Sequence, residues 1–272
     1  MSSHVLFDAP GPKARRRSLI FSIISLVIVA AIVLWAILTL AGPRQSSGIT
    51  LPGSFDPSRW DIFTDPRVWR DIGLGALATL EAAAVAAALA LAIGIAFSIL
   101  RTSASAWVRI PATVVLEFFR GMPVLLLMLF ILLASSFGAF WAVVLGLAVY
   151  NGAIIGEILR AGIVSLPRGQ REAGLSLGLT HLQTKSFIEY PQAFRQMLPV
   201  IVAQLVVLLK DTSLGYIVGY NELIRTTMNN MLSFYGNRYQ LSLFIVTLVI
   251  YLAINLSLSA VARRLARRRP VR

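Results

Sequence analysis

The feature that most limits how this chain can fold is its series of long apolar runs. Several runs exceed eighteen residues and carry almost no charge, which is enough for an α-helix to cross the hydrocarbon core of a bilayer. Hydrophobic residues make up 57% of the 272 residues, above the roughly 45–50% typical of soluble domains. The sequence therefore predicts an all-α integral membrane protein. We expect six spans, at residues 19–41, 72–100, 112–135, 137–161, 196–219 and 240–262.

The first apolar run has two interpretations, a membrane span or a cleaved secretion signal. Basic residues at 13–17 precede it, and both kinds of segment begin in this way. The run covers residues 19–41, whereas the apolar part of a secretion signal has only about 7–15 residues. We therefore predict a retained helix, with cleavage near Ala41 as the alternative.

Lysine and arginine residues are concentrated in alternate segments between the expected spans. Such residues are enriched in cytoplasmic segments of membrane proteins. This bias places both termini and the loop after the fourth span in the cytoplasm, and the segment 42–71 outside. Of the 25 basic residues, 18 lie in the expected inner segments, 1–18, 101–120, 160–195 and 263–272.

Composition also excludes several classes of function. The net charge of +13 would suit nucleic acid, but the charges flank apolar runs instead of forming one basic face, so we expect no nucleic-acid partner. There is no cysteine, and the two histidines, His4 and His181, are far apart, so we expect no metal site and no cofactor. No phosphate-binding Gly-x-x-x-x-Gly-Lys-Ser/Thr loop and no Ser/His/Asp arrangement is present. We therefore expect that the chain is not an enzyme.

The polar loop 164–195 carries the most specific pattern in the chain. Its spacing predicts two short helices, at 171–177 and 179–188, because Gly178 permits a sharp turn between them. We expect the second helix to stop before Pro191.

This loop also carries apolar side chains that would suit insertion into a groove of a partner. The alternative is an ordinary helical loop that packs on the membrane bundle. The side chains in question are Leu175, Leu177, Leu179 and Leu182.

The loop resembles the "EAA" loop of the membrane subunits of ATP-binding-cassette (ABC) importers. That pattern is Glu-Ala-Ala, three residues, Gly, nine residues, Ile, one residue and Leu-Pro. Here Glu172-Ala173-Gly174, Gly178 and Ile188-Glu189-Tyr190-Pro191 fall in the same register. Two residues differ from the pattern, since Gly174 stands in place of alanine and Tyr190 in place of leucine.

Three further segments resemble the histidine/glutamine-type permeases of type I ABC importers, which carry polar amino acids. The resemblance extends over about 72–264. The opening Asp8 to Pro12 is similar to actinobacterial glutamate-type permeases. The three segments are Glu117 to Pro123 (with Met122 where threonine is usual), Tyr150 to Ile163, and Leu209 to Leu214.

The resemblance implies an architecture, a mechanism and a set of partners. The permease domain would be a five-helix core over 72–264 with coupling loop 164–195, preceded by an added helix at 19–41 and followed by a basic tail, 265–272. It implies transport by alternating access in a bacterial inner membrane. The implied protein partners are a dimer of separate ATPase subunits, a second permease subunit of the same or a similar chain, and an external substrate-binding protein. The implied substrate is an amino acid, with glutamate or glutamine as the first expectation. The residues expected to couple the chain to the ATPase are Glu172, Ala173, Gly174, Gly178 and Leu182.

Charged residues near or within the spans are the remaining candidates. Glu117 and Arg120 lie three residues apart, so they share a helix face and can pair, either as a gate or as a structural pair. We expect Gly121 and Pro123 to bend that helix. A charge inside a membrane is by default a functional hypothesis. Lys210, Asp211, Thr212 and Ser213 therefore form a candidate substrate pathway, with a buried ion pair as the alternative.

The sequence leaves two alternatives to the importer. One is an ATP-independent secondary transporter or channel, and the other is a membrane-embedded assembly protein. Secondary transporters often show inverted repeats with matched broken helices. The sequence has no internal repeat of convincing period, which favours the importer.

Overall fold

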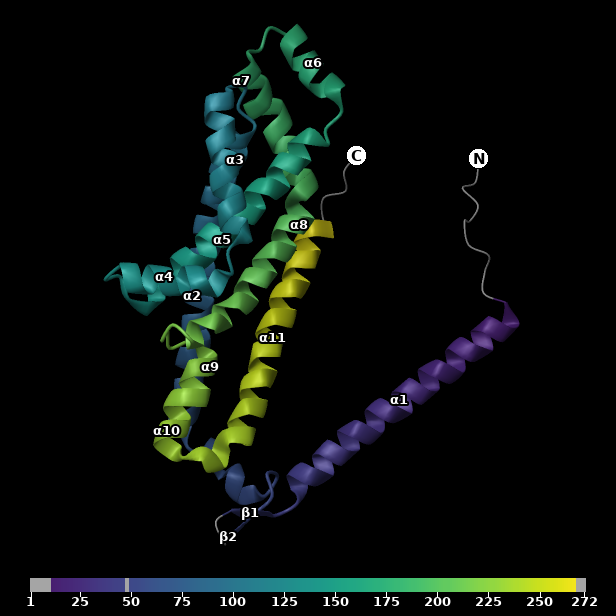
Figure 1. Ribbon diagram of the computed structural model, residues 1–272, viewed down its shortest axis with the longest axis vertical. Coiled ribbons are helices and arrows are strands. Elements are labelled where there is room, and N and C mark those ends of the chain that lie inside the picture. The colour runs from purple at the N-terminus through teal and green to yellow at the C-terminus, as the bar shows by residue number, and fades with distance from the viewer. Residues whose placement is uncertain (1–10, 47–48, 268–272) are drawn as a thin grey trace. The chain divides into compact units, whose positions relative to one another are not determined.

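The computed structural model describes residues 11–46 and 49–267. The chain forms two compact units, Met1–Ile62 and Phe63–Arg272. The Asp8 to Pro12 segment and the tail 265–272 lie mostly outside the described residues. Across the described part the chain is almost entirely helical, which confirms the prediction of an all-α membrane protein (Figure 1).

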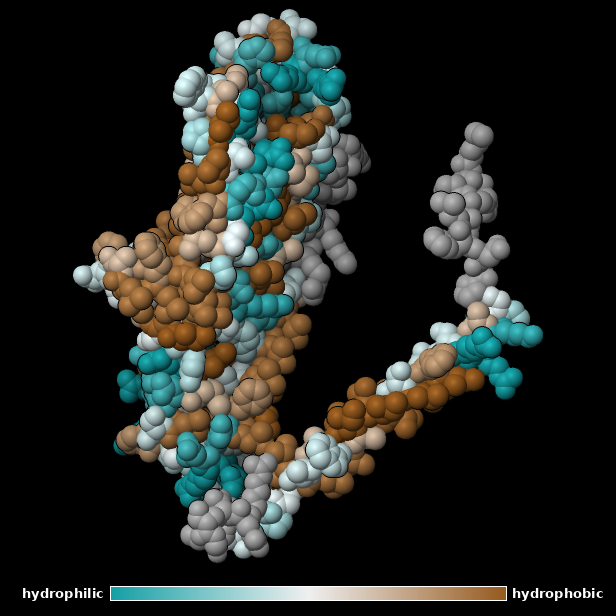
Figure 2. Space-filling view, in the orientation of Figure 1, coloured by the Kyte–Doolittle hydropathy of each residue, from teal (hydrophilic) through white to brown (hydrophobic). Residues whose placement is uncertain are grey.

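The first unit is dominated by one long helix, α1 (Pro12–Ala41). None of its residues is buried within this chain, and its middle part is apolar, with hydrophilic residues at its N-terminal end (Figure 2). A helix that is apolar all round is suited to lipid or to a partner helix. After it, the segment 42–71 contains a small antiparallel hairpin, β1 (Arg44–Ser46) and β2 (Ile49–Leu51), and then the 3₁₀ helix η1 (Pro57–Arg59).

The second unit is a helical bundle. Its long helices are α2 (Pro66–Arg101), α5 (Gly138–Val164), α8 (Tyr190–Asp211) and α11 (Gln240–Arg267). The shorter elements are η2 (Asp61–Thr64, which begins in the first unit), α3 (Ala106–Gly121), α4 (Val124–Ala134), α6 (Arg168–Ser176), α7 (His181–Thr184), the π-helix η3 (Lys185–Glu189), η4 (Thr212–Tyr216), α9 (Leu223–Arg225), the π-helix η5 (Thr226–Met231), α10 (Leu232–Tyr235) and η6 (Asn237–Tyr239).

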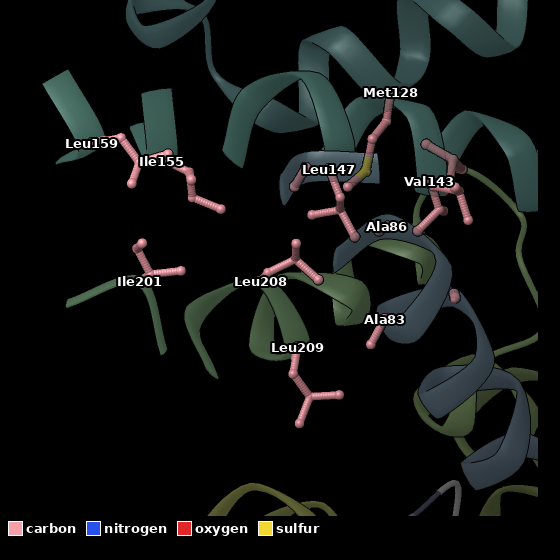
Figure 3. Close-up of a cluster of buried hydrophobic side chains, with 14 residues drawn as sticks. Ala83, Ala86, Met128, Val143, Leu147, Ile155, Leu159, Ile201, Leu208 and Leu209 are labelled. Atoms are coloured by element: carbon pink, nitrogen blue, oxygen red, sulfur yellow. The ribbon is translucent and has the colours of Figure 1, made fainter. Parts of the chain in front are cut away.

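Helices α2 and α5 form the centre of the bundle, and glycines let them approach closely. A side chain at Gly94 would come within 2.6 Å of Ile155, and one at Gly152 would come within 2.6 Å of Ile93. Each glycine therefore receives an isoleucine from the other helix, the small-residue packing by which membrane helices associate. Around this crossing, buried side chains from α2, α4, α5 and α8 form one apolar cluster (Figure 3).

Five helical segments in the described part of the chain are long and apolar enough to cross a membrane. A sixth span results if α3 and α4 are counted as one broken span, since they meet at 102°. The bend falls at Met122 and Pro123, as expected from Gly121 and Pro123. The span predicted over 112–135 therefore consists of two helices, α3 and α4, because Pro123 has no N–H to continue the ladder. The second span also begins earlier than expected, at Pro66, where the Asp65 carboxylate accepts from the Arg67 N–H at 2.8 Å.

The fifth predicted span differs most from the structure. The second short helix of the loop was expected to stop before Pro191, but α7, η3 and α8 run on as one helical segment, His181–Tyr216. The π-helix directly before the proline explains the continuity. The N–H of Tyr190 donates to the Lys185 carbonyl five residues back. This wider turn accommodates Pro191, which has no N–H to donate. The α-helix then ends at Asp211, before the expected boundary at 219.

Candidate functional site

The loop between α5 and α8 is built around one glycine with a left-handed backbone. Gly178 has φ +80°, a conformation that costs other residues energy. Its N–H donates to the Leu175 carbonyl at 3.0 Å, and the Leu179 N–H donates to the Gly174 carbonyl at 3.2 Å. These two bonds are a Schellman motif, which closes α6 and reverses the chain. The predicted turn at Gly178 is therefore present.

A capping box begins the helix that follows the turn. The Gln183 N–H donates to the Thr180 hydroxyl at 3.2 Å, and the Thr180 N–H donates to the Gln183 side-chain oxygen at 2.8 Å. The turn is therefore fixed on both sides by local hydrogen bonds. Because α7 runs into η3 and α8 without a break, displacement of this loop would act directly on a membrane-spanning helix.

Gly174 has a packing role that the sequence pattern did not predict. It is buried, and a Cβ there would lie 2.8 Å from Ile188 and 2.8 Å from Thr184. The residue that replaces alanine in the pattern therefore lets α6 lie directly on α7 and η3.

The remaining residues that the resemblance assigns to coupling, Glu172, Ala173 and Leu182, are exposed. Glu172 and Ala173 are exposed, and no cation of the described residues lies within ion-pairing distance of the Glu172 carboxylate. Leu182 is 71% exposed, and so is Phe187 at 70%, a residue that the sequence analysis missed. An unpaired carboxylate beside exposed apolar side chains is a surface that suits a protein partner.

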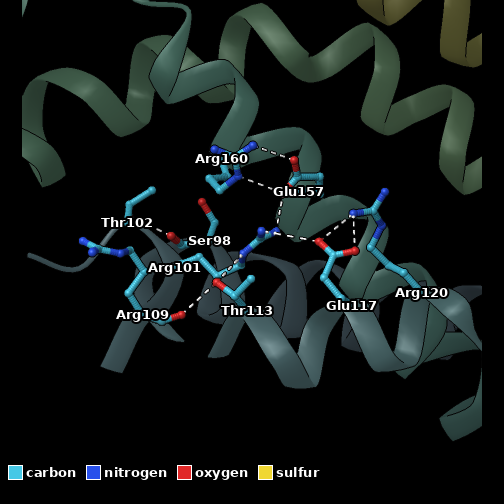
Figure 4. Close-up of polar contacts among 9 residues, drawn as sticks. All are labelled: Ser98, Arg101, Thr102, Arg109, Thr113, Glu117, Arg120, Glu157 and Arg160. Atoms are coloured by element: carbon cyan, nitrogen blue, oxygen red, sulfur yellow. Dashed lines mark hydrogen bonds and ion pairs between the residues drawn. The ribbon is translucent and has the colours of Figure 1, made fainter. Parts of the chain in front are cut away.

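A five-residue charge network joins the ends of α2, α3 and α5 (Figure 4). Arg101, from the last turn of α2, bonds the Glu157 carboxylate and lies 3.5 Å from Glu117. Its side chain is only 9% exposed. Arg120 pairs with Glu117 at 3.0 Å and Arg160 with Glu157 at 2.6 Å. The expected Glu117–Arg120 pair is therefore one part of a larger network, whose central cation, Arg101, the sequence analysis did not single out.

The candidate pathway residues divide between two environments. Lys210 is exposed on this chain, and no carboxylate of the described residues lies within 4.0 Å of its ammonium. Asp211 is half-buried. The hydroxyls of Thr212 and Ser213 donate to carbonyls of α8, at 2.6 and 2.8 Å, so in this conformation they close the end of that helix.

Two buried polar features of the core lie outside the candidate sites predicted from the sequence. Asn151 is fully buried in α5, and its side-chain oxygen accepts from the Gln204 amide of α8 at 2.8 Å. Glu222 is also fully buried and caps α9, since its oxygens accept from the N–H groups of Ile224 and Arg225, both at 2.8 Å. An isolated amide within an apolar run was the available signal for the first feature.

A basic cavity of about 590 Å³ lies at the base of the loop. The carboxylates of Glu172 and Glu189 also line it, and Arg101 and Arg160 are already paired with Glu157. The basic residues in its lining are Arg101, Arg109, Arg160, Arg168, Arg171, His181 and Lys185. Within the described residues, no group of three or more histidine or carboxylate side chains could hold a metal ion.

Comparison with known proteins shows the family. Residues 88–270 match the family described as the binding-protein-dependent transport system inner membrane component. The chain is 40% identical over 224 residues to the glutamate transport system permease protein GluD of Corynebacterium glutamicum, covering 79% of this chain and 81% of that one. It is 37% identical over 157 residues to the probable glutamine ABC transporter permease protein GlnP of Bacillus subtilis, covering 56% and 72%.

Solved structures agree with this. An amino acid ABC transporter crystallised with histidines has a chain that superposes with a TM-score of 0.67 at 26% identity, covering 75% of this chain and 96% of that one. The inward-facing MetNI methionine ABC transporter has the same fold, with a TM-score of 0.63 at 17% identity, covering 75% and 98%.

The chain belongs to the binding-protein-dependent transport system inner membrane component family. It is a transmembrane permease subunit of an ABC importer and a multi-pass protein of the inner membrane. The matches described above are ABC importer subunits, and they give no support to the alternative of a secondary transporter or channel.

Proposed function

We propose that this permease imports a polar amino acid, glutamate or glutamine first, by alternating access driven by separate ATPase subunits. The relatives named for glutamate and glutamine transport support the substrate class. Two permease subunits would pair, and an external binding protein would deliver the amino acid. The positive-inside bias supports placing both termini and the loop 164–195 in the cytoplasm.

The observation that carries this proposal is the exposed, glycine-turned loop that continues into α8. The unpaired Glu172 carboxylate and the exposed Leu182 would contact the ATPase, while Gly178 keeps the loop in shape and Gly174 packs it. Because α7, η3 and α8 are continuous, movement of the loop on ATP binding would tilt α8. The proposed substrate pathway lies where α8 ends at Lys210 and Asp211 and η4 begins with Thr212 and Ser213.

The test of coupling measures capture of the ATPase and ATP-dependent uptake in parallel. Glu172→Arg and Gly178→Leu should each lower both by about tenfold or more, as expected when about 1.4 kcal/mol of binding is lost. Gly73→Leu is the matched control, because Gly73 lies in α2 and a Cβ there meets nothing within 4 Å. Parental capture and uptake in both loop variants would contradict the coupling role.

The substrate pathway is tested separately. Lys210→Ala should lower uptake of labelled glutamate while capture of the ATPase stays normal, because its ammonium has no ion-pair partner among the described residues and could bind a carboxylate. Lys210→Arg should keep part of the uptake. Normal uptake by Lys210→Ala would remove this residue from the pathway. We propose that the Glu117–Arg120 pair acts in gating. Replacing either residue should therefore lower uptake of labelled glutamate and leave capture of the ATPase normal.

A further inference from the structure

A second cavity, of about 500 Å³, lies beside the base of the coupling loop. The last turns of α2 form one wall, with Ile95 and Ile99, and the segment from α7 into α8 forms the other. Its lining is mainly apolar, and Leu159 closes it at the side of α5. Ile95 and Ile99 are 39% and 47% exposed, so the groove is open to its surroundings.

The position of the groove along α2 fixes its depth in the bilayer. Ile95 and Ile99 belong to the end of the apolar stretch of α2, and Arg101 follows at once. This is where a membrane helix leaves the hydrocarbon and enters the headgroup layer. Tyr190 faces the same level from α8, where its hydroxyl lies 3.4 Å from the Ser98 hydroxyl. Tyrosine is typical of this interfacial depth.

Two cations line the groove, ten residues and therefore about 15 Å apart along the continuous α7 to α8 segment. Lys185 and Arg195 line it, and Lys185 also lines the basic cavity next to it. The Lys185 ammonium donates to the Thr102 carbonyl, which leaves two further N–H donors. Arg195 is exposed and carries a guanidinium that matches a phosphate in geometry. The groove therefore combines an apolar wall at hydrocarbon depth with the Lys185 ammonium at the end of α2, at headgroup depth, and with the Arg195 guanidinium further along α8.

We propose that this groove binds an anionic phospholipid of the leaflet on the side of the coupling loop. An acyl chain would lie along Ile95 and Ile99, and the phosphate would meet Lys185 and Arg195. Basic pockets between membrane helices are suited to acidic headgroups. The bound lipid would touch α2 and the α7 to α8 segment together, at the point where the loop joins its membrane helix. This inference does not depend on which amino acid is carried.

The binding test uses native mass spectrometry of the full-length chain titrated with phosphatidylglycerol, and with phosphatidylcholine of the same acyl chains. Phosphatidylglycerol should bind about tenfold more tightly, as two basic residues near an acidic headgroup allow. Lys185→Gln with Arg195→Gln should remove the preference. Arg15→Gln with Arg16→Gln is the matched control, because it removes the same charge from α1 and should change nothing.

Three outcomes would overturn the proposal. They are equal binding of the two lipids, an unchanged preference in the groove variant, and an equal loss in the control. If the double variant fails to fold because Lys185 also bonds Thr102, Arg195→Gln alone should still weaken phosphatidylglycerol several-fold. Lys185→Arg with Arg195→Lys should restore the preference.

A second measurement asks what occupies the groove. The chain has no cysteine, so Ile99→Cys gives a single thiol inside the groove. A phosphatidylglycerol carrying a thiol-reactive group on its acyl chain should label this cysteine, and Ile110→Cys, on the exposed surface of α3, should label far less. A disulfide between two copies through Ile99→Cys, with no lipid labelling, would show that a second chain covers the groove and would overturn the proposal.

Discussion

At the scale of single residues, the loop between α5 and α8 depends on backbone geometry more than on side-chain contacts. Gly178 has a positive φ and open space where a Cβ would be. Gly174, by contrast, has an ordinary helical backbone, but Thr184 and Ile188 leave no space for a Cβ. One motif therefore contains two glycines kept for different physical reasons, a left-handed turn and a close approach.

Replacing Gly178 by alanine should loosen the loop without any steric clash. The left-handed conformation costs an L-residue about 1–2 kcal/mol, so the α6 to α7 turn should open more often. Hydrogen–deuterium exchange of peptides covering 168–184 should rise about 5- to 30-fold. Gly169→Ala, at a site in α6 that is also open but has no positive φ, should leave exchange unchanged or slow it. Equal exchange in the two variants would contradict this account of Gly178.

The two carboxylates of the charge network should differ in importance, because they differ in burial. The Glu157 side chain is 25% exposed and bonds Arg101, whose side chain is 9% exposed, whereas that of Glu117 is 50% exposed. Glu157→Gln should lower the free energy of unfolding by about 2–3 kcal/mol, because it leaves a buried guanidinium under-compensated. Glu117→Gln should cost under about 1 kcal/mol. Thermal unfolding in detergent measures the effect of both variants. Equal effects would mean that burial does not decide how much each carboxylate contributes to stability.

At the scale of elements, the crossing of α2 and α5 sets how tightly the bundle packs. The two helices approach until Gly94 of one meets Ile155 of the other and Gly152 meets Ile93. Lipid tails are as apolar as the helices, so this contact gains its stability from close packing and not from the exclusion of water. The stability of the bundle therefore depends on a few positions without side chains.

Gly152→Ala should be clearly destabilising. Its Cβ would lie 2.6 Å from Ile93 and 3.2 Å from the Ala90 carbonyl, and a backbone atom cannot turn away. We expect a loss of about 1–3 kcal/mol, the usual cost of overpacking. Gly73→Ala, in α2 with nothing within 4 Å of the added Cβ, should have no effect or stabilise slightly. Thermal unfolding of both variants checks this, and a harmless Gly152→Ala would show that the helices can separate at little cost.

At the scale of the whole molecule, the chain divides into a long helix with its hairpin and a packed bundle. Helix α1 has no residue buried within this chain. The bundle, by contrast, contains the apolar cluster, the charge network and the coupling loop. Its stability should therefore not depend on α1.

Removing residues 1–41 should leave the bundle folded. We expect its thermal unfolding midpoint to stay within about 2 °C of the parent, because no residue of α1 is buried within this chain. Removal of α11 is the contrasting truncation, since α11 packs on α8 and contains the buried Leu243, and it should prevent stable accumulation. A truncated chain without α1 that fails to accumulate would show that this helix is needed for folding.

Much of this arrangement was predictable from sequence because it depends on local chemistry. In lipid, a long apolar run satisfies its backbone hydrogen bonds by forming a helix. Gly178 allows the left-handed backbone that its turn requires. The break at Pro123 followed from the missing N–H. The continuation through Pro191 did not follow, because a π-turn accommodates the proline there, and the sequence carries no sign of it.

By itself, then, the sequence determined the membrane helices, the glycine-turned loop and the membership of a permease family, since each depends on residues close together in the chain. Only the tertiary structure decided that Arg101 joins two carboxylates from α3 and α5, that Gly174 is a packing position, and that an apolar groove meets Lys185 and Arg195. These features join residues that are far apart in sequence. Their positions depend on how closely α2, α5 and α8 approach, and no local pattern specifies that distance.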